Sequence, residues 1–229
     1  MGYFPDLSRP FRDQRVRMVG WLDEHHPFQT GSPQRWMVEK LWTFCEHLFG
    51  HAGGFHECTL VGCPGPCKKS KIHFGGRRPS ARTIQKRHDA LRGRFLSGQL
   101  KNAPEDYKAQ FLNSLDQDLK RALRGYSKMV IGVHPQTGQR MSLGYAEIWI
   151  FGKRGKIYQA PNMVYHYVTV HHYKPPDEFV EALKHSPCPP DPEYVEHLKR
   201  AGFPAMFMDG FQKIWEVKKS QRDAKRKSA

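Results

Sequence analysis

Apolar residues recur at helical spacing early in the chain and predict a first helix that begins at Pro33. Ser32 is its expected N-cap, and the helix continues to about Phe49. The apolar positions are Trp36, Met37, Leu41, Trp42, Phe44, Cys45 and Leu48. Positions spaced in this way share one helix face, so we expect this face to pack in the core.

Two more helical stretches follow each other closely enough to form a helical hairpin. Ser80 is placed to cap a basic helix over residues 81–96, and Pro104 opens a second helix that Gly125 ends. The second helix has a regular apolar face, whereas the first is rich in Arg and Lys. We therefore expect the hairpin to direct its basic face outward.

The rest of the chain alternates between β-rich and helical segments. Strands are predicted over residues 55–60, 129–133, 145–151 and 157–160. The Gly-Lys-Arg-Gly turn at residues 152–155 joins the last two strands as a hairpin. Further helices are predicted over residues 162–172, 177–185, 193–201 and about 208–222.

The composition indicates a globular protein of a reducing compartment. Apolar residues make up 38% of the 229 residues, and no apolar run approaches the roughly 20 residues that span a bilayer. The N-terminus has neither the basic nor the apolar region of a secretory signal. The five cysteines are an odd number and suggest no disulfide framework. We expect a cytoplasmic protein without a membrane partner.

Four potential metal ligands lie within twelve residues. His56 and Cys58 are two apart, so on a strand both side chains project from the same face. Cys63 follows on a tight Pro-Gly-Pro loop that ends at Cys67. Thiolates on such a loop beside a strand ligand favour a structural Zn²⁺ site. The fourth ligand is either the local Cys67 or the distant His166.

The chain also resembles a family of short, uncharacterised bacterial proteins with a domain of unknown function. The resemblance rests on VGWLD at residues 19–23, HPF at 26–28, GFH at 54–56 with Cys58 and Cys63, APN at 160–162, YHYV at 165–168 with His171, and PP at 175–176 followed by Glu178 and Phe179. It implies His56, Cys58, Cys63 and His166 as the ligands of one zinc ion. Two extra residues between Cys58 and Cys63 depart from the family pattern.

The resemblance further implies a division of the chain. Residues 1–67 and 142–184 would form the family-like α+β core, residues 68–141 an inserted basic helical hairpin and strand, and residues 185–229 a helical C-terminal extension. The predicted fold class is α+β: a small, mostly antiparallel sheet flanked by helices and tied by zinc, with the helical hairpin inserted.

The positive charge is concentrated in two segments. The formal net charge is +15. Residues 68–101 contain eleven basic residues and one acidic residue, and residues 213–229 contain seven and two, so the remaining chain is neutral. The residues predicted to contact a polyanion are Lys68, Lys69, Lys71, Arg77, Arg78, Arg82, Lys86, Arg87, Arg92 and Arg94. Such a concentration is typical of a nucleic-acid-binding surface.

The sequence therefore predicts a zinc-stabilised protein that binds the phosphate backbone of DNA or RNA through basic helices. Two alternatives stay open. One is a metal-dependent hydrolase, such as a nuclease, that uses the His/Cys site with an open coordination position. In this case Glu57 adjoins the ligands, although on a strand it would point to the opposite face. The other is a structural subunit of a larger assembly with a protein partner.

Overall fold

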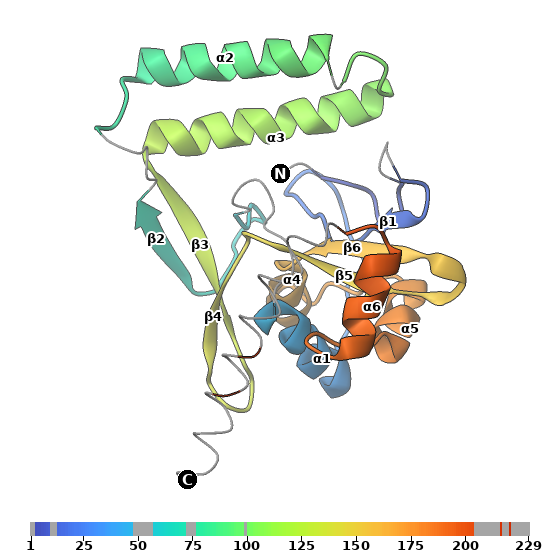
Figure 1. The fold of residues 1–229 in the computed structure, drawn as a ribbon. Coiled ribbons are helices and arrows are strands. Elements are labelled where there is room, and N and C mark those ends of the chain that lie inside the picture. Colours follow the sequence, from blue (N-terminus) through green and yellow to red (C-terminus); the bar gives the residue numbers. More distant parts are fainter. Residues whose placement is uncertain are drawn as a thin grey trace.

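The structure is a computed structural model that describes residues 3–9, 13–47, 57–71, 77–98 and 100–203, together with Glu216 and Ser220. It is an α+β fold with two small sheets. Figure 1 shows the first sheet gathered with helices into a body, while the second sheet leads from this body to a separate helical hairpin.

The first sheet has the strand order β1-β6-β5. β1 (Val16–Met18) is parallel to β6 (Ile157–Pro161), and β5 (Glu147–Phe151) is antiparallel to β6. The turn between β5 and β6 requires left-handed backbone at Arg154 (φ 57°) and Gly155 (φ 71°). The predicted hairpin over these two strands is therefore confirmed.

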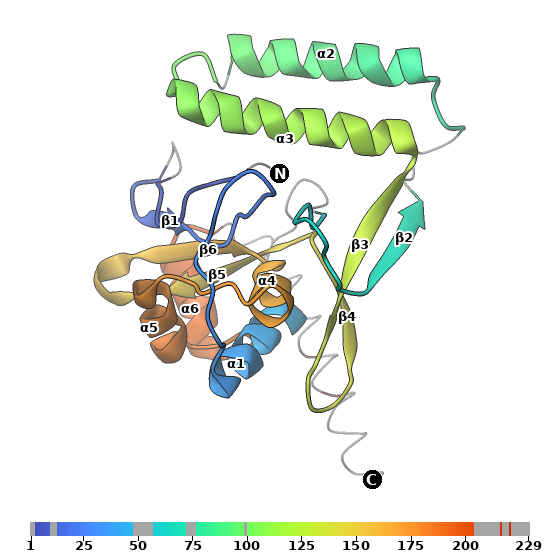
Figure 2. The same cartoon turned by 180° about the vertical axis from the view of Figure 1, so that it is seen from behind.

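Four helices pack around this sheet. They are α1 (Arg35–Glu46), α4 (Val164–Val170), α5 (Asp177–His185) and α6 (Pro192–Arg200). Figure 1 shows α1 and α5 below β5 and β6 with α6 in front of the sheet, and Figure 2 shows α6 behind it. The fully buried side chains between them include Leu41, Ile148, Ile150, Val164, Phe179, Leu183 and Leu198. Removal of this apolar surface from water is the main stabilising contribution to the body.

The second sheet connects the body to the hairpin. Its order is β2-β3-β4, with β2 (Cys67–Lys71), β3 (Tyr126–Val133) and β4 (Arg140–Leu143) all antiparallel. The first half of β3 pairs with β2 and its second half pairs with β4, and Val130 is common to both. Val130 and Leu143 are buried in the core cluster, which fixes this end of the sheet to the body.

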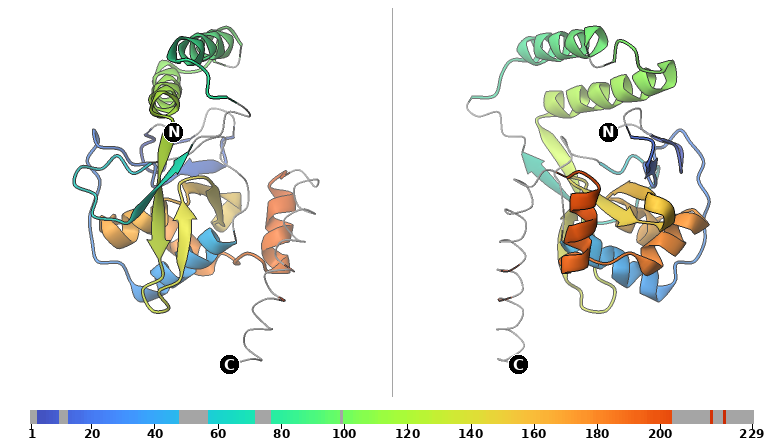
Figure 3. Two further views of the ribbon diagram at one scale, coloured as in Figure 1. Left: turned by 90° about the vertical axis from the view of Figure 1, so that its left-hand side faces the viewer. Right: turned by 45° about the vertical axis from the view of Figure 1, so that its right-hand side comes forward.

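The helical hairpin consists of α2 (Ala81–Ser97) and α3 (Glu105–Arg124). The Ser80 hydroxyl accepts a hydrogen bond from the Thr83 backbone N–H at 3.2 Å, which confirms the predicted N-cap. Gly125 ends α3 in the left-handed conformation (φ 79°), as the position of this glycine predicts. Figure 3 shows α3 next to the body and α2 on its outer side.

Some sequence-based expectations differ from the structure. The N-cap of α1 is Gln34 rather than Ser32, because Thr30 and Gly31 are held in extended backbone by bonds to the segment at Tyr173. The strand over residues 55–60 is wrong for its described part, since residues 57–60 lie outside any strand. The helix predicted over 208–222 falls largely outside the described residues. The division into core, insertion and extension stays a prediction.

The fold offers a direct test of which leucines belong to the core. Leu41 of α1 is fully buried, whereas Leu123 of α3 is 38% exposed. We expect Leu41→Ala to lower the free energy of unfolding by about 2–5 kcal/mol, because it removes buried methyl groups and leaves a cavity. Leu123→Ala is the matched control and should cost about 1 kcal/mol or less. Urea unfolding monitored by circular dichroism measures both, and equal losses would contradict this core assignment.

Candidate metal centre

Two cysteines and two histidines from distant parts of the chain meet at one point. The ligand atoms of Cys58, Cys63, His166 and His171 all lie within 4.8 Å of one another. The cysteines belong to the loop before β2, and the histidines belong to α4 and its C-cap.

None of the helices in the described residues combines the length and apolarity that a bilayer crossing requires.

The distances between the ligand atoms fit a tetrahedral ion. Cys58 Sγ lies 3.4 Å from His171 Nε2, and Cys63 Sγ lies 3.3 Å from His166 Nε2. The two Nε2 atoms are 3.2 Å apart. Zinc bonds of about 2.3 Å to sulfur and 2.0–2.1 Å to nitrogen separate S from N by about 3.6 Å and N from N by about 3.3 Å. The four side chains thus occupy the corners of a site of the right size.

The α4 segment positions both imidazoles. Its first turns are buried, and His166 itself is only 1% exposed. His171 is the C-cap residue, and its backbone N–H donates to Tyr167 O. His172 follows in the left-handed region (φ 54°), which turns the chain so that the Tyr173 N–H also donates to Tyr167 O at 3.0 Å. This sharp helix end holds His171 beside His166, where a continued helix would not.

The cysteine loop is fixed against α4 and β3. Pro66 O accepts a hydrogen bond from Ile131 N at 2.8 Å, which joins the end of the loop to the second sheet. Gly65 lies directly against the His166 ring, and a Cβ at this position would fall 2.4 Å from His166 Cε1. Only a residue without a side chain allows the loop to approach the imidazole this closely.

Glu57, which precedes the first cysteine, faces away from the site. Its carboxylate accepts hydrogen bonds from Arg124 Nη2 at 2.7 Å and from the backbone N–H of Lys128 at 2.9 Å. The Glu57 side chain is 11% exposed in this ion pair. Its role is therefore to join the cysteine loop to the end of α3 and the start of β3.

Burial changes the acid–base properties of the ligands. Desolvation, followed by the charge of His171, lowers the pKa of His166 to about 4, so this imidazole is neutral at pH 7. Desolvation, followed by the neighbouring Cys63, raises the pKa of Cys58 to about 12. A bound divalent cation opposes this second effect, because it favours the thiolate. Neutral imidazole is the form that binds a metal.

Three of the four ligands implied by the resemblance come together here, namely Cys58, Cys63 and His166. His56 lies outside the described residues. Cys67 is exposed at the start of β2 and is not one of the four. Sequence reasoning did not select His171 as a ligand. The signal for it was its position in the same motif as His166, but a chain with 13 histidines offers many such neighbours.

The fold and this group of side chains define an α+β protein with a Cys₂His₂ group that can hold a metal ion. The family described as "Domain of unknown function (DUF7919)" matches residues 2–105 and 99–184. The chain therefore belongs to this family. Neither the curated proteins nor the solved structures contain a match to the chain.

The predicted polyanion-binding residues have different environments. Arg92 forms an ion pair with Asp116 of α3 at 3.1 Å. Arg78 donates to the carbonyl groups at the end of α3, and Lys69 lies over the Tyr126 ring. Six others are exposed and make no side-chain hydrogen bond, ion pair or ring contact with another described residue, namely Lys68, Arg77, Arg82, Lys86, Arg87 and Arg94. For Lys71 the structure describes only the backbone in β2, and the basic C-terminal segment lies almost wholly outside the described residues.

The geometry predicts that His171 binds the metal and that its neighbour does not. We expect His171→Ala to weaken zinc binding by more than the roughly 10- to 100-fold that outer-shell changes cause, because it removes a ligand. The exposed His172 is the matched control, and His172→Asn, which tolerates the left-handed backbone of this position, should retain stoichiometric zinc. Competition with a chromophoric chelator measures both affinities. Equal affinities for the two variants would exclude His171 as a ligand.

The close approach of Gly65 to His166 gives a second prediction for the same site. Gly65→Ala should displace the imidazole, because the added methyl group would overlap its Cε1 atom. We expect weaker zinc binding and a changed visible spectrum of the Co²⁺-substituted protein. Gly93→Ala on α2 is the control, since a Cβ there meets nothing within 4 Å. An unaltered Co²⁺ spectrum in Gly65→Ala would show that the loop does not hold the ring.

Proposed function

We propose that this protein binds zinc at Cys58, Cys63, His166 and His171 as a structural ion, and that α2 binds the phosphate backbone of a nucleic acid. The observation on which the nucleic-acid part rests is the distribution of charge between the two helices of the hairpin. The residues of the metal site support the zinc part independently.

The donor set favours zinc in a structural role. Two thiolates with two imidazoles are a usual ligand set for structural zinc. Four protein ligands complete a tetrahedron and leave no open position for the water that a catalytic ion activates. Glu57, the nearest acidic neighbour in sequence, is held by Arg124 and Lys128. These features make the metal-dependent hydrolase the weaker hypothesis.

The basic charge of the hairpin belongs to its outer helix. α2 contains five basic residues and one acidic residue, whereas α3 contains four of each. α2 is also the helix farther from the body (Figure 1). A cationic helix supported on a neutral one presents its charge to a partner without attracting its own protein.

The exposed basic residues of α2 share one side of the helix. At 100° per residue, Arg82, Lys86, Arg87 and Arg94 fall within an arc of about 140°. The opposite side contacts α3 through buried Ile84 and half-buried Phe95, whose ring lies 4.7 Å from that of Phe111. The basic stripe is about 18 Å long at 1.5 Å per residue, which is enough to meet several phosphates.

A reducing, cytoplasmic location fits this proposal. The structure describes all five cysteines as free, and a zinc site needs Cys58 and Cys63 as thiolates rather than a disulfide. Oxidation of this pair would release the metal.

Charge reversal on α2 tests the nucleic-acid interaction. We expect Arg82→Glu, Lys86→Glu and Arg87→Glu together to weaken binding to labelled duplex and single-stranded DNA and RNA by at least about tenfold at low salt. The slope of log K against log[salt] should become shallower by about two to three units, because up to three phosphate contacts are lost. Fluorescence anisotropy across a salt series measures both quantities.

The matched control has the same change in net charge on the body. It combines Arg154→Glu, Lys184→Glu and Arg200→Glu, all at exposed positions away from the hairpin. This variant should lose much less affinity than the α2 variant. Equal losses would mean that only the total charge matters, and no binding by the unaltered zinc-loaded protein would refute the nucleic-acid function altogether.

A further inference from the structure

The pair of strands β2 and β3, which we call the ribbon, continues from the hairpin toward the body. It leaves the hairpin at the end where α2 begins and α3 ends (Figures 1 and 2). Arg78, just before α2, donates to the backbone carbonyl groups of Ala122 and Leu123 at the end of α3. The exposed Arg77 lies in the same short connection. The start of the basic helix is therefore fixed beside the start of β3.

Two lysines face each other across the strands of the ribbon. Lys69 of β2 is the direct cross-strand partner of Lys128 of β3. Both residues are exposed, and neither forms an ion pair through its side chain with a carboxylate in the described part of the chain. Directly opposed residues have Cβ atoms about 5 Å apart, so like charges at such positions destabilise a sheet. An anion that contacts both ammonium groups would relieve this repulsion.

The ring of Tyr126 holds a further cation at the same place. Lys69 Nζ lies 5.2 Å from the centroid of this ring, and Arg124 Cζ lies 5.4 Å from it. Cations are attracted to the face of an aromatic ring by its quadrupole. The carboxylate of Glu57 contacts this group through the Arg124 guanidinium and the backbone N–H of Lys128. Three cations and one carboxylate thus meet here, which leaves this end of the ribbon cationic.

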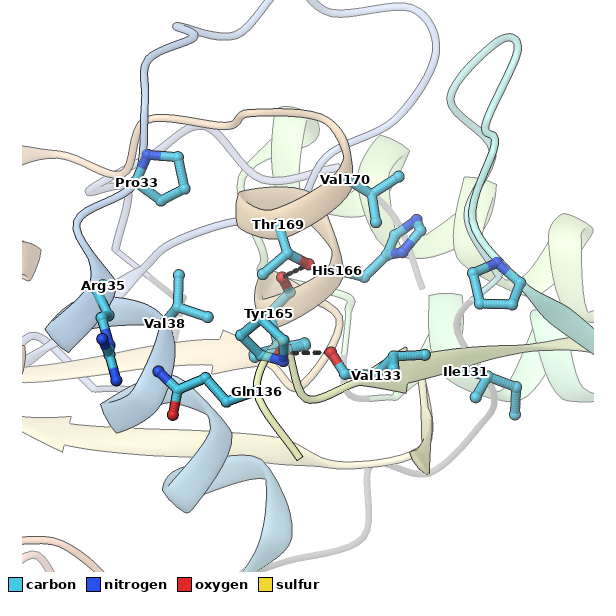
Figure 4. Close-up of a pocket in the computed structure, with 13 residues that line it drawn as sticks. Pro33, Arg35, Val38, Ile131, Val133, Gln136, Tyr165, His166, Thr169 and Val170 are labelled. Carbon is cyan, nitrogen blue, oxygen red and sulfur yellow. Dashed lines mark hydrogen bonds between the residues drawn. The ribbon is translucent and has the colours of Figure 1, made fainter. Parts of the chain in front are cut away.

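The other end of β3 is bound to the body, so the ribbon has a fixed direction. Figure 4 shows the Tyr165 hydroxyl of α4 donating to Val133 O, at 2.9 Å. Val130 and Leu143 are buried in the core cluster of the body. Figures 1 and 2 show that the ribbon runs down from the hairpin, across the direction of α2. A path along α2 and then along the ribbon therefore turns where the two meet.

We propose that a single-stranded nucleic acid binds along α2 and continues onto the ribbon, where its phosphates meet Lys69 and Lys128. This inference rests on the proposed function and names the class of nucleic acid. A flexible single strand can follow the turn between the two surfaces. A duplex resists bending, because its persistence length is about 150 base pairs. A duplex that lies along the straight basic side of α2 therefore leaves the ribbon lysines without a phosphate.

Protection of a sheet edge does not account for this arrangement. Lysine on an edge strand prevents the strand from pairing with another chain, and β2 lies at the edge of its sheet. This role requires positive charge on β2 only. It gives no reason for Lys128, which lies on the central strand β3 directly opposite Lys69. A shared anion gives a reason for both lysines.

Neutralisation of the ribbon tests the inference with the zinc-loaded full chain. Lys69→Gln together with Lys128→Gln should weaken binding of labelled single-stranded RNA and DNA at least about fivefold at low salt. The slope of log K against log[salt] should become shallower by up to about 1.4 units, because each lost phosphate contact to a single strand contributes about 0.7. Binding of a duplex of the same length should change by less than about twofold. Fluorescence anisotropy measures these quantities.

The matched control removes the same charge from the body. It combines Lys184→Gln of α5 with Lys199→Gln of α6, both at exposed positions. This variant should keep the affinity of the unaltered protein for the single strand within about twofold. Urea unfolding of both variants shows whether they are folded. The ribbon variant should be about as stable as the unaltered protein, because it loses a repulsion between like charges.

The outcomes separate this inference from the proposed function. If the ribbon variant binds the single strand as tightly as the unaltered protein does, the inference is overturned and α2 stays the proposed surface. Equal losses for single strand and duplex in the ribbon variant also overturn it, because the ribbon then does not distinguish the two. If affinity falls in the ribbon variant but not after charge reversal of Arg82, Lys86 and Arg87, the proposed role of α2 fails while the ribbon site is supported.

Discussion

The structure depends on the convergence of four metal-ligand atoms at the contact between the cysteine loop and the end of α4. Cys63 and His166 are 103 residues apart in sequence, yet their ligand atoms are 3.3 Å apart. Each of these sulfur and nitrogen atoms carries a lone pair. Lone pairs this close together in a buried site do not stabilise one another unless a proton or a cation lies between them. A divalent ion at this point would convert an unfavourable arrangement into a strong cross-link and would close a long loop.

This contact also sets the position of the helical hairpin. Cys58 belongs to the candidate metal site, and the adjacent Glu57 binds Arg124 at the end of α3 and the backbone of Lys128 in β3. On the other side of the loop, Pro66 joins β3 through its carbonyl group. The same short segment thus links the body, the second sheet and the hairpin.

The sequence predicts those parts of the fold that depend on local chemistry. α2, α3 and α5 were located almost to the residue, because Ser80, Gly125 and the Pro-Pro-Asp segment specify helix ends locally. β2 was missed because Cys-Lys-Lys-Ser-Lys has no apolar alternation, and it is a strand only through its pairing with β3. The second sheet is therefore a tertiary feature that periodicity does not reveal.

The residues of the candidate metal site also divide into those that the sequence could identify and one that it could not. Cys58, Cys63 and His166 could be chosen as ligands from residue type, spacing and family resemblance. The assignment of His171 could not, because it depends on how α4 ends, with His172 in a left-handed conformation.

The hairpin shows why the location of charge matters more than its total. Of the basic residues predicted to meet a polyanion, Arg92 is neutralised by Asp116 and Arg78 closes the end of α3. These two cations hold the hairpin together. They would stabilise the same structure whether or not a partner exists. The exposed arc of Arg82, Lys86, Arg87 and Arg94 has no such structural role, and clustered like charges destabilise a helix through repulsion. This repulsion lies on the outermost helix, while α3 beneath it is neutral. It lowers the stability of the free protein, and the proposed external anion would relieve it.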